Sequence, residues 1–165
     1  MPDLLVPLYR LPDGRPLVER LRAEHGIVVR RAYPFELARV RRFITKHFHE
    51  AWADEAEASF ARQPLTCWIA IREKRVVGFS CVDSTLRGFF GPTGVDEALR
   101  GLGVGAALLL VALQGLKDMG YGYGIIGGAG PVEFYEKIAG ATVIPDSSPG
   151  VYVDMLGSDD PDGER

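Results

Sequence analysis

The stretch Arg100-Gly101-Leu102-Gly103-Val104-Gly105 lies between an apolar run that ends at Val95 and an apolar helical segment that begins near Ala106. Three glycines among five residues let the backbone turn sharply and approach a ligand closely. A helix that begins directly behind them presents unpaired N–H groups and a partial positive charge, both of which favour phosphate oxygens. Arg100 adds a full positive charge. We therefore predict a loop here that binds a diphosphate.

Two other kinds of glycine-rich loop fit this stretch less well. A Rossmann fingerprint requires a glycine where Ala106 stands and a tight turn directly after the strand, whereas residues 96–99 intervene here. A Walker loop requires Gly-Lys followed by Ser or Thr, which this stretch lacks. A glycine-rich turn without any ligand also stays open from the loop alone.

The spacing Arg-x-x-Gly-x-Gly of residues 100–105, preceded by Val95-Asp96 and followed by an Ala- and Leu-rich helix, resembles the acetyl-CoA-binding motif of the GNAT (general control non-repressible 5-related) N-acetyltransferase superfamily. A second stretch, residues 130–141, is similar to the family's later motif, in which a Phe-Tyr pair lies on a short helix; here the pair is Phe134-Tyr135. One predicted helix (residues 104–119) and one predicted strand (residues 123–126) separate the two motifs, as the resemblance requires.

The rest of the chain supplies elements in an order that fits this resemblance. Apolar periodicity predicts a first strand near residues 27–30, two helices within residues 37–48 and 52–60, and two strands at residues 67–71 and 76–82. Residues 142–144 and 151–156 are expected to close the sheet as a final antiparallel pair.

A third run, residues 87–95, contains Gly91, Pro92 and Gly94. Proline cannot donate to a strand ladder, so we expect this strand to bulge or splay from its neighbour. The helix that follows connects it in a right-handed crossover to residues 123–126, so these two strands run parallel. The resemblance implies an α/β (α+β) GNAT acyl-CoA N-acyltransferase fold: a mixed, mostly antiparallel sheet with a splayed central parallel strand pair, flanked by helices.

The chain is expected to hold one domain, because 165 residues with 47% apolar content sustain a single core. Residues 1–26, with several prolines and a short helical pattern, are expected to be an N-terminal extension packed on the domain. Residues 27–156 form the predicted GNAT domain, and residues 157–165 a disordered acidic tail.

Charge and composition exclude several kinds of partner. Without the tail the chain carries eighteen acidic and eighteen basic residues, which argues against a nucleic-acid-binding face. No stretch reaches the roughly 20 apolar residues of a membrane span, and no signal peptide is evident, so we expect a soluble cytoplasmic protein. Three histidines without a Cys-x-x-Cys indicate no metal site. Cys67 and Cys81 are expected to be buried and reduced. A homodimer stays open.

The resemblance implies that acetyl-CoA binds with its diphosphate on the glycine loop and with its pantetheine arm paired, like an added strand, along the splayed strand. An amine would then attack the thioester directly, without a metal or a covalent enzyme intermediate. The implied cofactor-binding residues are Gly94, Val95, Arg100, Gly101, Gly103, Val104, Gly105 and Ala106.

Two catalytic residues are proposed from the sequence. The resemblance implies that Tyr135 is the general acid that protonates the leaving thiolate. We expect Tyr135 to face the slot and Phe134 to turn into the core. Asp83, at the end of the preceding strand, is the nearest carboxylate for a general base; Glu133, His47, His49 and a water chain stay open as alternatives. Gly128 and Pro131 stand where many family members carry Asn and Ala, so a side-chain hydrogen bond to pantetheine is missing.

These features together predict an acetyl-CoA-dependent N-acetyltransferase that acetylates an amine of a small molecule. The alternative is a non-catalytic acetyl-CoA-binding or regulatory module, because no base stands out in the sequence. A third hypothesis is a Rossmann-type protein that binds a dinucleotide. The sequence leaves the acceptor amine and the length of the acyl group open.

Overall fold

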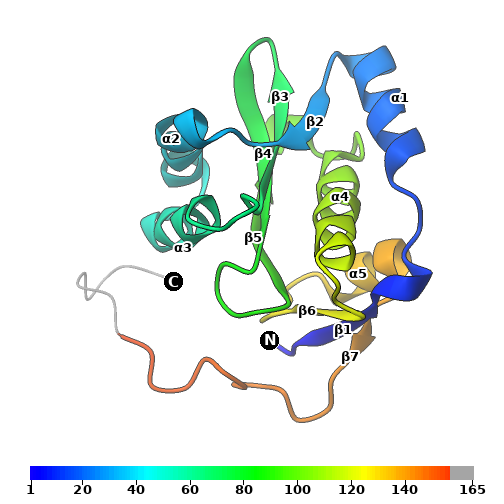
Figure 1. Cartoon of the computed structure of the whole chain (residues 1–165), viewed down its shortest axis with the longest axis vertical. Coiled ribbons are helices and arrows are strands. Elements are labelled where there is room, and N and C mark those ends of the chain that lie inside the picture. Colours follow the sequence, from blue (N-terminus) through cyan, green and yellow to red (C-terminus); the bar gives the residue numbers. More distant parts are fainter. Residues whose placement is uncertain (157–165) are drawn as a thin grey trace.

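A seven-stranded mixed sheet separates two groups of helices in the computed structural model, which describes residues 1–156 (Figure 1). Helices α2 and α3 cover one face, and α1, α4 and α5 lie on the other. The predicted acidic tail, residues 157–165, lies outside the described residues. The strand order is β2-β3-β4-β5-β6-β1-β7. The strands are β1 (Leu4–Pro7), β2 (Val28–Arg31), β3 (Cys67–Arg72), β4 (Arg75–Val82), β5 (Phe89–Val95), β6 (Tyr123–Ile126) and β7 (Thr142–Val143).

The helices agree with the apolar periodicity of the sequence to within a few residues. Gly140 ends the last of them, as its place after Ala139 predicts. The α-helices are α1 (Arg15–His25), α2 (Leu37–His47), α3 (Glu50–Phe60), α4 (Val104–Asp118) and α5 (Val132–Ala139). Three short 3-10 turns, Leu8–Arg10, Pro34–Glu36 and Glu97–Leu99, connect them.

The splayed parallel pair is confirmed. Strands β5 and β6 run parallel and pair only at Phe89↔Ile125 and Phe90↔Ile126. Residues 93–95 of β5 pair with β4 alone. The register between β4 and β5 shifts at Gly91 and Pro92, where the bulge is predicted. One backbone edge of β5 beyond Phe90 therefore has no sheet partner.

The N-terminal segment is a strand of the sheet and not an extension packed on it. Strand β1 lies between β6 and β7, antiparallel to both, with Leu4 opposite Ile126 on one side and Val143 on the other. The expectation that residues 151–156 pair with β7 is wrong, because β1 occupies that edge and residues 151–156 form no strand. Leu4 and Val6 are fully buried, whereas Val151 and Val153 are about half exposed.

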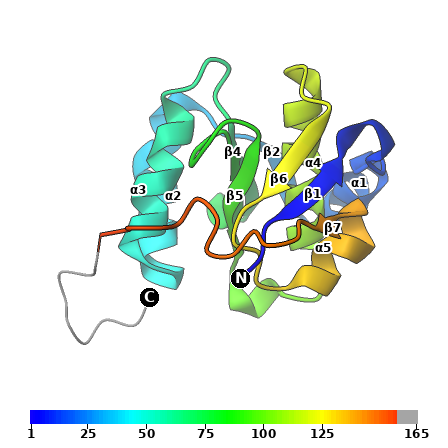
Figure 2. The ribbon, with the colours of Figure 1, turned by 90° about the horizontal axis from the view of Figure 1, so that it is seen from below.

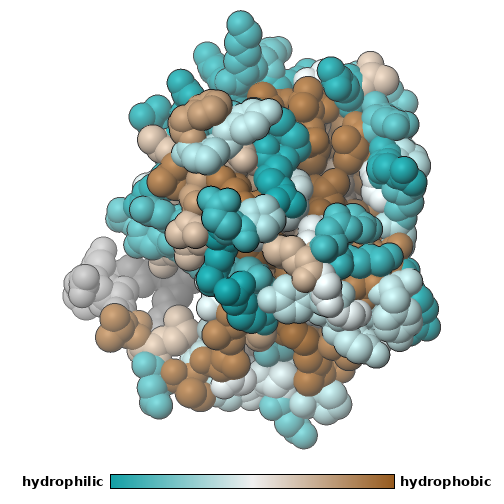
Figure 3. Space-filling model, viewed as in Figure 1, coloured by the Kyte–Doolittle hydropathy of each residue, from teal (hydrophilic) through white to brown (hydrophobic). Residues whose placement is uncertain are grey.

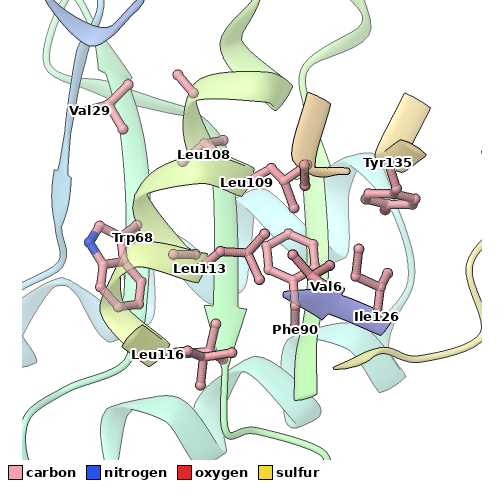
Figure 4. Close-up of a cluster of buried hydrophobic side chains, with 14 of the residues drawn as sticks. Val6, Val29, Trp68, Phe90, Leu108, Leu109, Leu113, Leu116, Ile126 and Tyr135 are labelled. Carbon is pink, nitrogen blue, oxygen red and sulfur yellow. The ribbon is translucent and has the colours of Figure 1, made fainter. Parts of the chain in front are cut away.

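Helix α4 carries the larger of two cores. It is apolar on most sides because the sheet lies on one side of it and α1 and α5 contact the others. Figure 4 shows Leu109 and Leu113 of this helix beside Phe90 of β5. The Trp68 ring occupies the space that a Cβ on Gly115 would fill, so the sheet and α4 approach closely there.

A second core lies between the sheet and the pair α2 and α3, around Phe43, Ile44 and Phe79. Cys67 and Cys81 face each other across β3 and β4 within it; both are fully buried with free thiols, as expected. A hydrogen bond with Cys81, together with burial, raises the pKa of the Cys67 thiol. None of the helices in residues 1–156 is long and apolar enough to cross a membrane.

If β1 is an integral strand, truncating its buried side chains must destabilise the whole domain. We expect Leu4→Ala to lower the free energy of unfolding by about 2–5 kcal/mol, because it removes a fully buried leucine from the sheet. The matched control is Leu86→Ala, since Leu86 is 42% exposed. Urea denaturation measures both; equal stabilities would show that β1 is dispensable.

Candidate active site

The predicted diphosphate loop adopts the backbone that its glycines allow. Gly101 has φ +84° and Gly103, the residue before α4, has φ +93°, a region in which other residues are strained. The first intrahelical bond of α4 runs from the Ala107 N–H to the Gly103 carbonyl, at 3.0 Å. The preceding amides, Val104, Gly105 and Ala106, therefore have no helical partner and are available to an anion.

Two arginines lie beside this loop, and the sequence analysis identified only one of them. Arg100 is exposed and pairs with Glu97 at 3.3 Å. Arg20 of α1 places its Nη2 atom 3.6 Å from the position of a Cβ on Gly103, and it forms no ion pair within residues 1–156. The sequence did not predict Arg20 as a neighbour of the loop, because its position depends on how α1 packs against α4, about eighty residues later in the chain.

The loop lies close to the end of β5 and to α5. A Cβ on Gly105 would lie 3.7 Å from Val95 of β5 and 3.8 Å from Phe134 of α5. A side chain at Gly105 would thus contact both a strand and a helix. Gly94 has a different reason to be glycine, because the Phe48 ring occupies the place of its Cβ. Close approach of pantetheine to Gly94 and Val95 stays a prediction.

The Phe-Tyr pair is rotated relative to the expectation. Phe134 lies near Gly105, whereas Tyr135 is 7% exposed and packs against Phe90 with ring centroids 6.3 Å apart (Figure 4). The orientation of α5 against the sheet, which its sequence does not encode locally, determines which ring turns inward. Tyr135 therefore lies at the base of the gap, beside the last paired residue of β5.

The Tyr135 hydroxyl remains available for chemistry. It makes no hydrogen bond to a side chain or backbone group of residues 1–156, and it is not among their enclosed unpaired polar atoms. Burial raises the pKa of Tyr135, so the phenol keeps its proton at neutral pH. A protonated phenol with a free hydroxyl fits a general acid.

Asp83 occupies a structural position. Its Oδ1 accepts the Gly88 N–H at 2.6 Å, and its Oδ2 accepts from Arg87 and the Tyr121 hydroxyl, both at 3.1 Å. Asp83 lines a cavity of about 220 Å³ together with Arg62 and Met119. Met119 comes just after the C-terminal end of α4. The diphosphate loop is at the other end of this helix. Asp83 holds the β4–β5 turn and stands apart from the gap.

The other predicted bases lie on the surface. The ring of His47 lies tilted against Phe43 and that of His49 against Trp52, and both histidines are exposed, as is Glu133. Residues 1–156 contain no cluster of three or more His, Cys, Asp or Glu side chains that would hold a metal ion.

The N-terminus holds the end of β6, a contact that the sequence analysis did not anticipate. The Asp3 Oδ1 accepts the Gly128 N–H at 2.8 Å, and the Pro2 carbonyl accepts the Ala129 N–H at 2.8 Å. Gly128 is the position at which a side-chain hydrogen bond was missing from the family pattern. Only the long-range pairing of β1 with β6 brings Asp3 there.

Solved structures share this fold. A GCN5-related glucosamine N-acetyltransferase region of a fungal multi-domain GH3 β-N-acetylglucosaminidase aligns with a TM-score of 0.70 at 18% identity, over 87% of this chain and 19% of that one. A GCN5-related N-acetyltransferase from Sphaerobacter thermophilus aligns with a TM-score of 0.67 at 18% identity, over 87% of this chain and 48% of that one. The chain thus spans about a fifth and about half of these proteins.

A GNAT family acetyltransferase from Brucella melitensis, solved in complex with acetyl-CoA, aligns with a TM-score of 0.55 at 18% identity, over 73% of this chain and 88% of that one. No curated protein matches the chain. The model of the acetyltransferase (GNAT) family matches residues 32–141, which include both the glycine loop and the Phe-Tyr helix. The chain belongs to the GNAT acetyltransferase family.

Proposed function

We propose that this protein transfers an acetyl group from acetyl-CoA to an amine of a small molecule. The observation that carries the proposal is the adjacency of two unsatisfied backbone surfaces: the first turn of α4 and the free edge of β5. The first suits a diphosphate and the second suits an extended, amide-containing chain. A single ligand with both parts in this order is acetyl-CoA, which the Brucella melitensis relative holds.

The chain's own residues would divide the binding as follows. The amides of Val104, Gly105 and Ala106 hold the diphosphate, with Arg20 and Arg100 as neighbouring cations. The free edge of β5 offers its N–H and C=O groups to the two amides of pantetheine. The thioester then lies where β5 and β6 separate, beyond Phe90 and Ile126.

The transfer needs no covalent enzyme intermediate. The amine nitrogen attacks the thioester carbon, and a backbone N–H at the splay stabilises the charge on the carbonyl oxygen. The new carbon–nitrogen bond forms first and the carbon–sulfur bond then breaks. Tyr135 donates its proton to the departing thiolate. The proton lost by the amine passes to solvent.

A non-catalytic acetyl-CoA-binding module is the second candidate. The observation in its favour is that Asp83 is fully engaged in hydrogen bonds and that the other predicted bases lie on the surface. Release of CoA in the presence of amines separates the two: a catalyst releases it in proportion to the amine, whereas a binding module does not.

Filling the space in front of Gly105 should block the diphosphate. We expect Gly105→Leu to raise the Kd of acetyl-CoA at least tenfold while the melting temperature stays within a few degrees, because a Cβ at Gly105 makes only ordinary contacts, the nearest at 3.7 Å. Gly122→Leu is the matched control, since Gly122 is exposed with open space around it. An unchanged Kd in calorimetry would place the cofactor elsewhere.

Arg20 should contribute through charge. We expect Arg20→Gln to weaken acetyl-CoA binding about two- to fivefold, the effect of one exposed ion pair, and the loss should shrink as salt is added. Arg22→Gln on the same helix is the control, because Arg22 is exposed and does not lie beside Gly103. Equal Kd values for the two variants at low salt would remove Arg20 from the site.

Tyr135→Phe should keep the packing against Phe90 and lose the proton donor. We expect kcat to fall about 10²-fold while acetyl-CoA affinity stays within twofold. Because burial raises the pKa of Tyr135, the wild-type rate should show no loss from phenol ionisation at neutral or mildly alkaline pH. A kcat within twofold of wild type, with chemistry rate-limiting, would leave Tyr135 as a packing residue.

A further inference from the structure

The N- and C-terminal segments meet at the end of β6, where β5 and β6 separate. Asp3 comes just before β1, and one step beyond the pair Leu4↔Ile126 the register places it opposite Gly127. The segment after β7 passes the same end of the sheet and continues beneath α3 (Figure 2). Both segments therefore reach the place where the proposed thioester lies.

Asp3 is a buried carboxylate that the protein neutralises only in part. It is 6% exposed, and its Oδ1 accepts the Gly128 N–H at 2.8 Å. Its Oδ2 lies 3.2 Å from the position of a Cβ on Gly150 and accepts no hydrogen bond from residues 1–156. The Met1 ammonium bonds Ser148 at 3.4 Å, and none of the ion pairs within residues 1–156 involves Asp3.

This carboxylate keeps one oxygen free. The Asp3 Oδ2 is not among the enclosed unpaired polar atoms of residues 1–156, so a ligand can reach it from outside. The hydrogen bond from the Gly128 N–H needs only one acceptor oxygen, which the side chain of an asparagine would also provide. The negative charge and the Oδ2 of Asp3 are therefore available to a cation of a ligand.

Tyr152 stands beside Asp3 on the same two glycines. Its hydroxyl occupies the space that a Cβ on Gly127 would fill, and its Cε2 lies 3.6 Å from the corresponding position on Gly128. The ring is half-buried, and burial, reinforced by the charges of Glu55 and Asp3, raises the pKa of Tyr152. The phenol therefore stays protonated at neutral pH and can hydrogen-bond as donor or acceptor.

Tyr152 and Tyr135 lie on opposite faces of the splay. Tyr135 packs with Phe90 and Ile126 in the core on the α4 side. Phe89 and Gly127 alternate with those residues and so face the other side, where the Tyr152 hydroxyl and the Phe89 ring both lie against Gly127. Val153 and Met155, in the segment around Tyr152, are exposed. Figure 3 shows apolar surface at the lower left of the molecule, where the C-terminal segment runs in Figure 1.

We propose that Asp3 and Tyr152 form the binding subsite for the acceptor amine, and that the acceptor is an amine that carries a positive charge at neutral pH. This inference rests on the proposed acetyl transfer. The Asp3 carboxylate pairs with the acceptor's ammonium, and the Tyr152 hydroxyl hydrogen-bonds the same nitrogen. The ammonium loses one proton to water before its nitrogen attacks the thioester, and Tyr135 on the opposite face protonates the departing sulfur.

The test compares two acceptors of similar size. 2-Phenylethylamine is protonated at neutral pH and 4-ethylaniline is not; CoA release with acetyl-CoA, followed by a thiol-reactive dye, gives kcat and KM for each. We expect the wild type to prefer 2-phenylethylamine. We expect Asp3→Asn, which keeps an oxygen for the Gly128 amide, to raise the KM for 2-phenylethylamine at least tenfold while the Kd of acetyl-CoA stays within twofold.

One control variant and one second variant accompany Asp3→Asn. Asp13→Asn removes an exposed carboxylate that pairs with Arg15 and should leave both KM values unchanged. If Asp3→Asn does not fold, Tyr152→Phe supplies the same readout, with an expected rise of a few-fold in the KM for 2-phenylethylamine.

Unchanged KM values in the folded variants, or a wild-type preference for 4-ethylaniline, would overturn the subsite and leave acetyl transfer standing. A wild type that binds no acetyl-CoA, or that releases no CoA with either amine, would overturn the proposed function and the subsite together.

Discussion

The separation of β5 from β6 after only two parallel residue pairs, at Phe89 and Phe90, is the constraint on which the rest of the site depends. Backbone N–H and C=O groups in a sheet interior require partners, and the edge of β5 beyond this point has none on one side. The first turn of α4 is likewise unpaired, and it lies at the end of the connection from β5. An extended ligand that ends in phosphates satisfies both surfaces at once, which links the fold to its proposed chemistry.

The chain termini complete this arrangement. Strand β1 inserts between β6 and β7, so the N-terminal residues stabilise the sheet and also fix the loop after β6 through Asp3. The helix that follows β1 brings Arg20 beside the diphosphate loop. The C-terminal segment adds Tyr152 on the opposite face from Tyr135. Residues that the sequence assigns to the periphery thus surround the place of the proposed reaction.

Local signals in the sequence predicted the elements and the glycine loop, because helical periodicity, strand alternation and turn residues act over a few positions. The Gly101 and Gly103 backbone and the splay at Gly91-Pro92 are of this kind. The predicted pairing of β7 with residues 151–156 was wrong. Val143 of β7 pairs instead with Leu4, a residue almost at the other end of the chain. The rotation of Phe134 and Tyr135 and the isolation of Asp83 depend on how elements pack, which no single segment encodes. Arg20, Asp3 and Tyr152 were missed for the same reason.

Amide hydrogen exchange with and without acetyl-CoA tests the central claim most directly, because it reads the two backbone surfaces themselves. We expect acetyl-CoA to slow exchange at the free edge of β5, at Gly91 and residues 93–95, and at the first turn of α4, residues 104–106. Protection there should exceed that of any other segment. Protection confined to the cavity lined by Asp83 and Arg87, or no protection anywhere, would contradict it.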